Sequence, residues 1–199
     1  MSEKKAKMIW SWREKVLNFL KPDSRLLDLS PCGKAFLLSL SHPAALCGEW
    51  RQGKKLTFPD NSFDLILCDG GEYDLSEIYR VLKSGGFFLT QQTGGEHLTG
   101  FLRRFAGETG RKEPDYNLEN QLPKFEEMGF RIMYRNQAYP VQRFSDAEQV
   151  WEYLSEQSGL FSNLPEKAKY CREQAQKEID TRGFLELEEH RFIIIAKKR

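Results

Sequence analysis

The stretch LTFPDNSFDLILCDGGEYDLSEIYRVLKSGGFFLTQQ, Leu56–Gln92, decides the fold of this chain. Within it, Asp64–Cys68 and Phe87–Gln92 are short apolar runs of the kind that form buried strands. Leu75–Leu82 between them has helical spacing, and Lys83–Gly86 ends the helix with two glycines that can adopt positive φ. A buried strand, a helix and a second buried strand in this order predict two parallel strands joined by a crossover helix.

The same alternation extends toward the N-terminus. Arg25–Leu29 and Ala44–Cys47 are short apolar runs, and residues 33–41 between them suit a helix. Residues 5–20 place apolar side chains at helical spacing, and Pro22 ends that helix. Strands that alternate with helices indicate an α/β fold whose parallel sheet is covered on both faces.

Downstream of Gln92, the pattern predicts more helices and a late return to the sheet. We expect helices at residues 95–106, 117–128, 145–158 and 165–181, and strands at Arg131–Tyr139 and in two runs around Glu188 and Glu189. We interpret the chain as a single domain, with an N-terminal helix in residues 1–22, a core in 23–140, a helical insertion in 141–185 and a final strand in 186–199. The insertion is either a lid over a substrate or a bundle that packs on the sheet or on a second subunit.

Composition limits the classes of function. The 30 Lys and Arg residues and the 29 Asp and Glu residues leave a net charge of +1, which argues against a nucleic-acid partner. We interpret the basic C-terminal residues, and Glu77 and Lys83, as solvated. No run is apolar enough to cross a membrane and no signal-peptide core follows the charged start, so we expect a cytoplasmic protein. The four cysteines form no CxxC pair and are expected to be free thiols.

Two motifs in the opening stretch resemble the middle of the class I S-adenosylmethionine-dependent methyltransferases. That family has a PF-D-x-x-F-D loop before its fourth strand, matched here by Thr57–Asp60 and Phe63–Asp64. It also has an E-x-x-R-V-L-K-P-G-G turn before its fifth strand, matched here by Glu77–Gly86. The resemblance covers roughly residues 25–140 and the final strand. It implies a Rossmann-like, doubly wound, mostly parallel sheet with an antiparallel last strand, and S-adenosylmethionine as the cofactor.

The segment LLDLSPCGKAF, Leu26–Phe36, lies where the first motif of the family belongs. That motif, D-x-G-x-G-x-G, uses glycines to let the backbone approach the methionine part of the cofactor. Aligned on Asp28, the three glycine positions hold Ser30, Cys32 and Lys34. Gly33 is out of phase with them. Side chains therefore stand where the cofactor should lie, and the lysine brings positive charge toward a sulfonium centre. This turn predicts weakened or lost cofactor binding.

The chain is also too short for the complete fold. Two strand–helix–strand units of about 30 residues each do not fit between Asp28 and Asp64, so about one strand–helix unit is missing. In the family, the missing region supplies an acid for the ribose and a support for the adenine. Glu49 and Trp50 are the residues that stand in for them. The alternative is a solvated carboxylate and an aromatic residue that covers the edge of the sheet.

Candidate site residues follow from these positions. The candidate cofactor contacts are Asp28, Ser30, Cys32, Gly33, Glu49 and Asp69. His97 and Tyr73 are the candidate catalytic residues, because each follows a strand at the sheet edge where open α/β folds bind ligands. The alternative for His97 is a plain loop role. Gln91 and Gln92 contact substrate or satisfy loop backbone. No metal-ligand set is expected from the family pattern.

Two functions remain open at this point. The first is a methyltransferase for small molecules with impaired cofactor binding, and the second is a non-catalytic relative that binds a small-molecule ligand or a protein partner in the same crevice. A third idea rests on Cys32, Cys47 and Cys68, which end neighbouring strands and would line one metal or redox site. The alternative is that these cysteines are small buried apolar residues.

Overall fold

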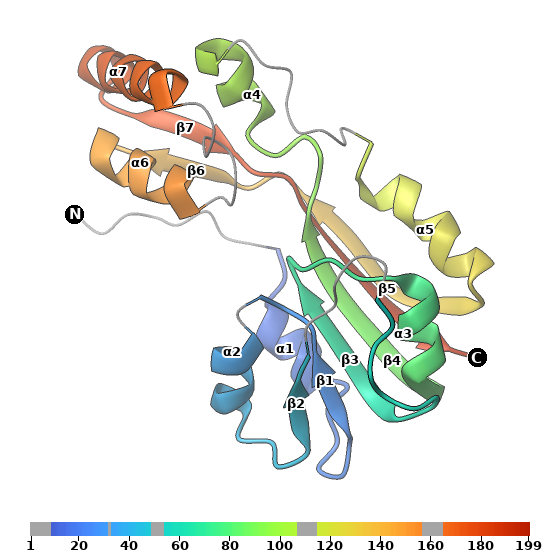
Figure 1. Ribbon diagram of the computed structural model, residues 1–199. Coiled ribbons are helices and arrows are strands. Elements are labelled where there is room, and N and C mark those ends of the chain that lie inside the picture. The colour runs from blue at the N-terminus through green and yellow to red at the C-terminus, as the bar shows by residue number, and fades with distance from the viewer. Residues whose placement is uncertain (1–8, 32, 49–53, 107–114, 157–164) are drawn as a thin grey trace. The chain divides into compact units, whose positions relative to one another are not determined.

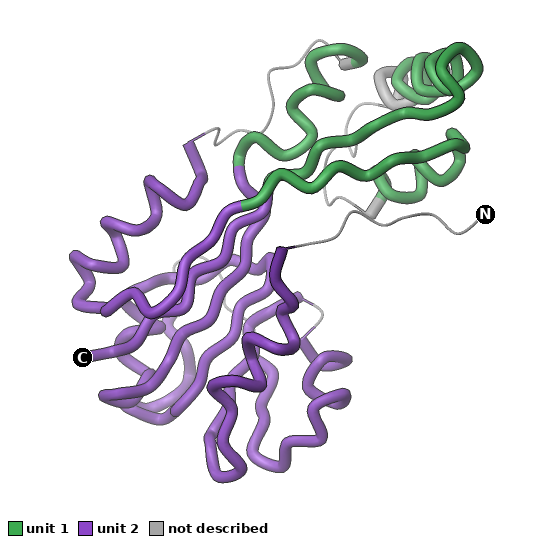
Figure 2. Tube along the Cα trace, turned by 180° about the vertical axis from the view of Figure 1, so that it is seen from behind, with its two compact units in different colours: residues 1–8, 95–114, 138–190 green, residues 9–94, 115–137, 191–199 purple. Residues whose placement is uncertain are grey.

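A computed structural model of the chain describes residues 9–31, 33–48, 54–106, 115–156 and 165–199 (Figure 1). The chain divides into two compact units (Figure 2). The larger unit comprises Ile9–Gly94, Asp115–Gln137 and Arg191–Arg199. The smaller unit includes Gly95–Pro114 and Ala138–His190.

The larger unit is built on a six-stranded sheet with the order β2-β1-β3-β4-β8-β5. Its strands are β1 (Leu26–Asp28), β2 (Ala45–Cys47), β3 (Phe63–Asp69), β4 (Leu82–Thr93), β5 (Phe130–Ala138) and β8 (Arg191–Lys198). The first four pair in parallel, whereas β8 is antiparallel to β4. A mostly parallel sheet whose last strand is antiparallel is the arrangement that the resemblance implied.

Helices cover both faces of this sheet (Figure 1). They are α1 (Trp12–Leu17), α2 (Gly33–Leu40), α3 (Leu75–Val81) and α5 (Leu118–Glu127). Alternate strand residues such as Ile66 and Phe88 form one core with Ile78 of α3 and Phe125 of α5. The strand residues between them, such as Leu67, are also fully buried, because successive side chains point to opposite faces. The doubly wound α/β fold is therefore confirmed.

The start of the chain differs in detail from the expected helix. Helix α1 covers six residues, and Ser11 caps it by accepting a hydrogen bond from the N–H of Glu14. Ile9 is 63% exposed and Leu17 is 47% exposed, so the apolar spacing overstated the buried face. Between β1 and β3, the described residues contain one helix and one strand, α2 and β2, as the short spacing required.

The smaller unit has its own sheet and its own core. It contains α4 (Thr99–Phe101), a π-helical turn (Leu102–Ala106), β6 (Val141–Phe144), α6 (Ala147–Glu156), α7 (Pro165–Arg182) and β7 (Leu185–Glu188). Strands β6 and β7 pair with each other in antiparallel fashion. Phe101, Leu154, Cys171 and Leu187 are among the side chains of its core. The helix expected at 95–106 is thus replaced by a short α-helix and a π-helical turn.

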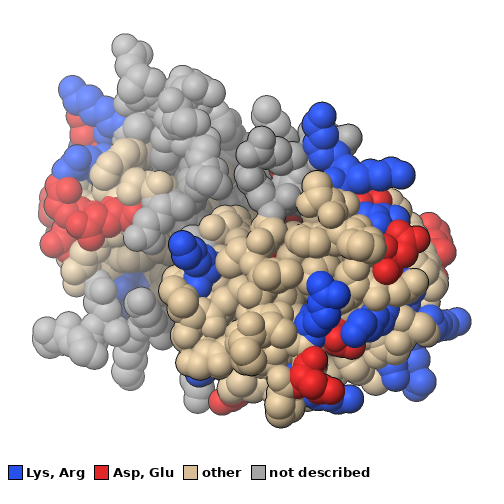
Figure 3. Space-filling model, turned by 60° about the horizontal axis from the view of Figure 1, so that its bottom comes forward, with Lys and Arg blue, Asp and Glu red and all other residues tan. Residues whose placement is uncertain are grey.

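On the face shown in Figure 3, lysines and arginines are interspersed with acidic residues and do not form a single field. Within the described parts of the chain, no helix combines the length and apolar character that a membrane crossing requires.

Candidate functional site at the carboxyl ends of the strands

The turn after β1 is closed by the side chain of Ser30. Its hydroxyl donates to Asp28 Oδ1 over 2.5 Å and accepts a hydrogen bond from the N–H of Asp69 over 2.7 Å. The N–H of Ser30 donates to the same Asp28 oxygen over 2.9 Å. Ser30 therefore connects the ends of two neighbouring parallel strands, β1 and β3. A glycine could not make the two side-chain bonds, because it lacks the hydroxyl.

Gly33 begins helix α2 directly against the carboxylate of Asp28. A Cβ atom at this position would lie 2.7 Å from Asp28 Cγ and 2.8 Å from Oδ2, closer than real Cβ atoms approach. Gly33 is out of phase with the glycines of the family, yet the packing of α2 on β1 requires it. Sequence reasoning detected the shift in phase and missed the packing role, because that role depends on where the Asp28 side chain points.

The carboxyl groups at this edge are largely removed from water. Asp28 is 1% exposed, and no described residue donates a hydrogen bond to its Oδ2 atom. Burial raises the pKa of Asp28, the Ser30 bonds oppose this shift, and the charge of Asp69 adds to it. Burial also raises the pKa of Asp69, against the lowering effects of the Gln91 amide and the charge of Arg191. Both acids therefore hold a proton more readily than they would in water.

Gln91 and Gln92 belong to opposite faces of the sheet, since they are consecutive residues of β4. Gln91 accepts a hydrogen bond on Oε1 from Trp10 Nε1 over 3.0 Å. Gln92 is buried, and its Nε2 donates to Thr90 Oγ1 over 2.8 Å and to the carbonyl oxygen of Gly71 over 3.2 Å. Gln92 thus satisfies loop backbone, the second of its two expected roles. The sequence-based expectation grouped the two amides, but strand alternation places them on opposite surfaces.

Tyr73, a candidate catalytic residue, packs against the hydrophobic core of the larger unit. Its ring meets Phe88 edge to face, with centroids 5.0 Å apart. Burial raises the pKa of Tyr73 well above its usual value, and the hydroxyl lies near Tyr116 and Thr90. Among the described residues, the hydroxyl has no hydrogen-bond partner of good geometry. A phenol in this setting stays protonated at neutral pH and cannot serve as a base.

His97, the other candidate catalytic residue, belongs to the smaller unit. Its side chain is fully buried, and Nδ1 accepts a hydrogen bond from the N–H of His190 over 3.2 Å. His190 is also buried, stacks on Tyr139 with centroids 4.7 Å apart, and accepts the N–H of Glu96 on its own Nδ1. Asp28 and Asp69 belong to the larger unit. Its contacts are those of a packed loop residue, and its proposed chemical role stays a prediction.

The remaining predicted residues divide into described and undescribed ones. Cys32, Glu49 and Trp50 lie outside the described residues. Cys47 is exposed on β2, whereas Cys68 is buried and donates from Sγ to a loop carbonyl oxygen. Burial raises the pKa of Cys68 to about 12, so its thiol is protonated at neutral pH. Where the structure describes the chain, no three His, Cys, Asp or Glu side chains are placed to hold a metal ion.

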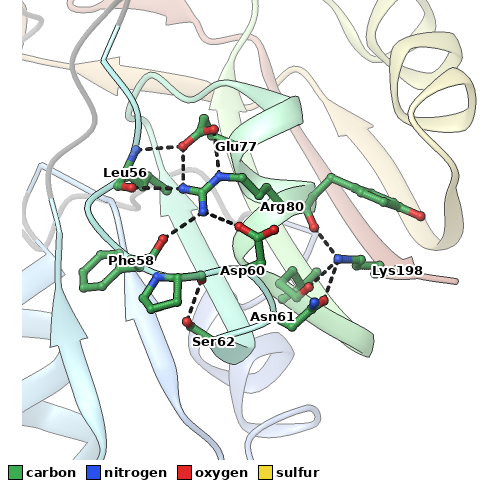
Figure 4. Close-up of polar contacts among 11 residues, drawn as sticks. Leu56, Phe58, Asp60, Asn61, Ser62, Glu77, Arg80 and Lys198 are labelled. Atoms are coloured by element: carbon green, nitrogen blue, oxygen red, sulfur yellow. Dashed lines mark hydrogen bonds and ion pairs between the residues drawn. The ribbon is translucent and has the colours of Figure 1, made fainter.

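The motif around Glu77–Gly86 has a structural role at the other end of the sheet (Figure 4). Arg80 donates to both carboxylate oxygens of Glu77 over 2.8 and 2.9 Å, and to Asp60 over 2.8 Å. It also donates to the carbonyl oxygens of Leu56 and Phe58. Glu77 accepts the N–H of Leu56 over 2.8 Å and is only 8% exposed. The interpretation of Glu77 as a solvated helix residue is therefore wrong.

Two lysines, Lys198 and Lys83, make polar contacts in the same region. Lys198 Nζ donates to the carbonyl oxygens of Tyr79 and Leu82 over 2.6 and 2.7 Å, and to Asn61 Oδ1 over 3.0 Å (Figure 4). It thereby satisfies carbonyls at the end of α3, where a cation is favourable. One member of the basic C-terminal cluster is thus a structural residue and not a solvated one. Lys83 stays near the surface and pairs with Asp64 over 2.8 Å.

Comparison with known proteins identifies the fold. No protein-family model and no curated protein sequence matches the chain. Among solved structures, a candidate methyltransferase from Bacillus halodurans C-125 is similar, with a TM-score of 0.60 and 16% identity over 94% of this chain and 97% of that chain. The YcgJ protein of Bacillus subtilis gives a TM-score of 0.57 and 15% identity over 94% and 97% of the two chains.

A [4+2]-cyclase, SpnF, is also similar, with a TM-score of 0.51 and 18% identity over 93% of this chain and 78% of that chain. At such low identity these similarities establish the fold and not the reaction. The chain has the fold of the class I S-adenosylmethionine-dependent methyltransferases, as its motifs implied.

Proposed function

We propose that this chain is a methyltransferase-fold protein whose binding of S-adenosylmethionine is weakened or lost, and that the carboxyl-end edge of its sheet serves a non-catalytic role. The observation that carries the proposal is the closure made by Ser30. The Ser30 side chain lies in the space between the ends of β1 and β3, where it is hydrogen-bonded to the Asp28 carboxylate and to the N–H of Asp69. In the family pattern, a glycine at this position leaves that space open to the cofactor.

The described residues of the first motif do not fit the cofactor. The family motif depends on close approach of the backbone, and here the Ser30 side chain lies in the way. Asp28 is enclosed at 1% exposure, so its carboxylate does not face a ligand. Its buried Oδ2 lacks a described donor, and an incoming amine would satisfy it only if the turn opened. No catalytic step is therefore assigned to the cofactor in this chain.

Loss of methyl transfer is compatible with a functional protein. The similar fold of SpnF carries a [4+2]-cyclase, so this architecture supports reactions other than methyl transfer. For this chain, a small molecule or a protein is the proposed partner of the carboxyl-end edge of the sheet. The cysteine-lined metal or redox site is less favoured, because Cys47 is exposed on β2 whereas Cys68 is buried and bonded to the carbonyl oxygen of Gly71.

Calorimetry and thermal unfolding with S-adenosylmethionine and S-adenosylhomocysteine test this proposal. We expect no heat and no rise in melting temperature at millimolar ligand. A ligand present at 100 times its Kd would stabilise the protein by about 2.7 kcal/mol, a shift that thermal unfolding detects readily. Micromolar binding by the unmodified protein would overturn the proposal.

Two variants of Ser30 show whether this side chain is the obstacle. Ser30→Gly removes both the hydroxyl and the Cβ, whereas Ser30→Ala removes the hydroxyl and keeps the Cβ. We expect Ser30→Gly to gain more cofactor binding than Ser30→Ala, because it also restores space for the ligand. Equal, absent binding in both variants, each shown to be folded, would place the obstacle elsewhere in the motif.

A further inference from the structure

The β5 strand forms one edge of the six-stranded sheet. It is nine residues long and stands last in the strand order, next to β8. No described strand pairs with its outer side, so that side presents backbone N–H and C=O groups. Such an edge is a template for one more strand.

Along β5, exposed side chains alternate with half-buried ones. Arg131, Met133 and Arg135 are exposed, while Ile132 and Tyr134 between them are half-buried. Met133 is 45% exposed, which is unusual for a large apolar residue flanked by two charges. Arg131 and Arg135 are four strand positions apart, about 13 Å at 3.3 Å per residue.

These residues line an open groove with a volume of about 530 Å³. Its lining includes Phe130, Ile132, the three side chains above, Arg199 beyond the end of β8, and Glu126 of α5. Three guanidinium groups therefore share the groove with one carboxylate. In the described part of the chain, Arg131, Arg135 and Arg199 make no ion pair or side-chain hydrogen bond, unlike Arg80 and Arg182, which are both paired.

We propose that the β5 edge binds an extended acidic segment of a protein partner, which adds to the sheet as a further strand. Backbone hydrogen bonds to β5 would hold the segment in place. Two of its carboxylates, four positions apart, would pair with Arg131 and Arg135, and an apolar side chain midway between them would cover Met133. This inference is independent of the cofactor question, because none of its residues belongs to the strand-end site.

An acidic partner fits this edge better than a second copy of the chain. An antiparallel pair of β5 strands centred on Met133 would place Arg131 of each copy opposite Arg135 of the other. Like charges directly opposite each other destabilise strand pairing. An acidic strand converts the same two contacts into favourable pairs.

Fluorescence anisotropy with a labelled heptapeptide, TETVTET, tests the proposal on the full chain. Its two glutamates and its valine match the spacing of Arg131, Arg135 and Met133. We expect saturable binding that weakens at least about tenfold, or about 1.4 kcal/mol, in the variant Arg131→Glu/Arg135→Glu. The control Lys124→Glu/Lys177→Glu makes the same change in net charge at exposed sites outside the groove and should leave the affinity unchanged.

Two more peptides separate strand addition from simple charge attraction. TKTVTKT should bind the charge-reversed variant better than it binds the unmodified protein. A form of TETVTET with alternate backbone amides N-methylated, on the side that would face β5, should lose binding, because it cannot complete the hydrogen-bond ladder.

Several results would overturn the proposal. Absence of TETVTET binding at millimolar peptide would mean that the arginines only protect the edge from aggregation. Unchanged affinity after N-methylation would remove strand addition. A single-stranded RNA 20-mer that binds more tightly than TETVTET and depends on the same arginines would make the groove a nucleic-acid site. Thermal unfolding of each variant establishes that it is folded.

Discussion

The carboxylate of Asp28 is the described acidic group that the fold isolates most from water, at 1% exposure. Its pKa is raised, mainly by burial. A raised pKa in the folded state means that the folded chain binds this proton more tightly than the unfolded chain does. Deprotonation of Asp28 at neutral pH therefore lowers the free energy of unfolding, and acidification restores it.

Replacing Asp28 with Asn should remove this pH dependence. The unfolding free energy of the unmodified protein should rise relative to that of Asp28→Asn as the pH falls from 7 toward about 4, the ordinary value for aspartate. Urea denaturation at several pH values measures the difference. A difference that stays constant with pH would contradict the assignment.

Asp74 offers a control of opposite sign. It caps helix α3 by accepting the N–H groups of Ser76 and Glu77, and its pKa is lowered, chiefly by its bond with the Ser76 side chain. Because the folded-state pKa is lowered, the ionised carboxylate stabilises the protein at pH values above the ordinary pKa of aspartate. This stabilisation is lost as the pH falls. The unmodified protein should therefore lose stability relative to Asp74→Asn on acidification.

One guanidinium group makes several of the links between helix α3 and the loop before β3. Arg80 donates to the carbonyl oxygen of Phe58 and to Asp60, and it neutralises the buried Glu77. This network explains why an arginine and a glutamate recur at this spacing in the motif. The sequence presents them as surface charges on a helix, but their partners are loop carbonyls some twenty positions away.

Truncation of Arg80 to Ala should lower the unfolding free energy by about 2–4 kcal/mol, because it leaves Glu77 buried without its counter-charge. Chemical denaturation measures the loss. Lys83→Ala, three positions further on in β4, breaks a pair whose side chains are 40% and 36% exposed, and should cost less than about 1 kcal/mol. Equal losses of unfolding free energy in the two variants would show that the Arg80 network stabilises the protein no more than the exposed Lys83–Asp64 pair does.

Local pattern predicted the central elements well because their signals are local. The apolar runs that became β3 and β4 and the glycines after α3 need no knowledge of distant residues. Gly85 has a φ of +78°, the conformation for which the sequence selected a glycine. The pairing of β6 with β7 was not predictable, because the two strands are far apart in sequence and their partners are set by the core they share.

The sequence predicted where the candidate site lies, but not whether the turn at Ser30 is open or closed. Asp28, Ser30 and Asp69 do meet at the strand ends, as parallel strands require. Whether Ser30 leaves the turn open or closes it depends on the direction of one hydroxyl, which only the neighbouring strand decides. His97 follows β4 in sequence but belongs to the smaller unit, a division that the sequence pattern did not indicate.

Each of the two units has a separate hydrophobic core, and each is assembled from discontinuous segments. The core of the smaller unit combines Phe101 and Phe105, from before the β5 strand, with α6, α7 and β7, from after it. Residues 141–185 thus do not supply this core alone. The larger unit likewise needs β8, which returns after the smaller unit is complete.

Replacement of Phe101 by Ala should therefore loosen the smaller unit first. Phe101 is 5% exposed, and loss of a buried phenylalanine costs about 3–5 kcal/mol. Hydrogen exchange should become faster in α7 and β7 and change little in β3. The exposed Tyr170 of α7 provides a control, since Tyr170→Ala should cost only about 0.5 kcal/mol. Equal acceleration in β3 and α7 would mean that the two cores unfold as one.

The position of β8 also has a consequence for synthesis on the ribosome. β8 lies between β4 and β5, and its central residues from Phe192 to Ala196 are fully buried. About fifty residues separate β5 from β8 in the chain, which takes several seconds to translate at about 5–20 residues per second. During that interval the nascent chain holds two unjoined sheet edges. A stop codon at position 191 would leave that gap permanently, so the sheet can close only after β8 has been translated.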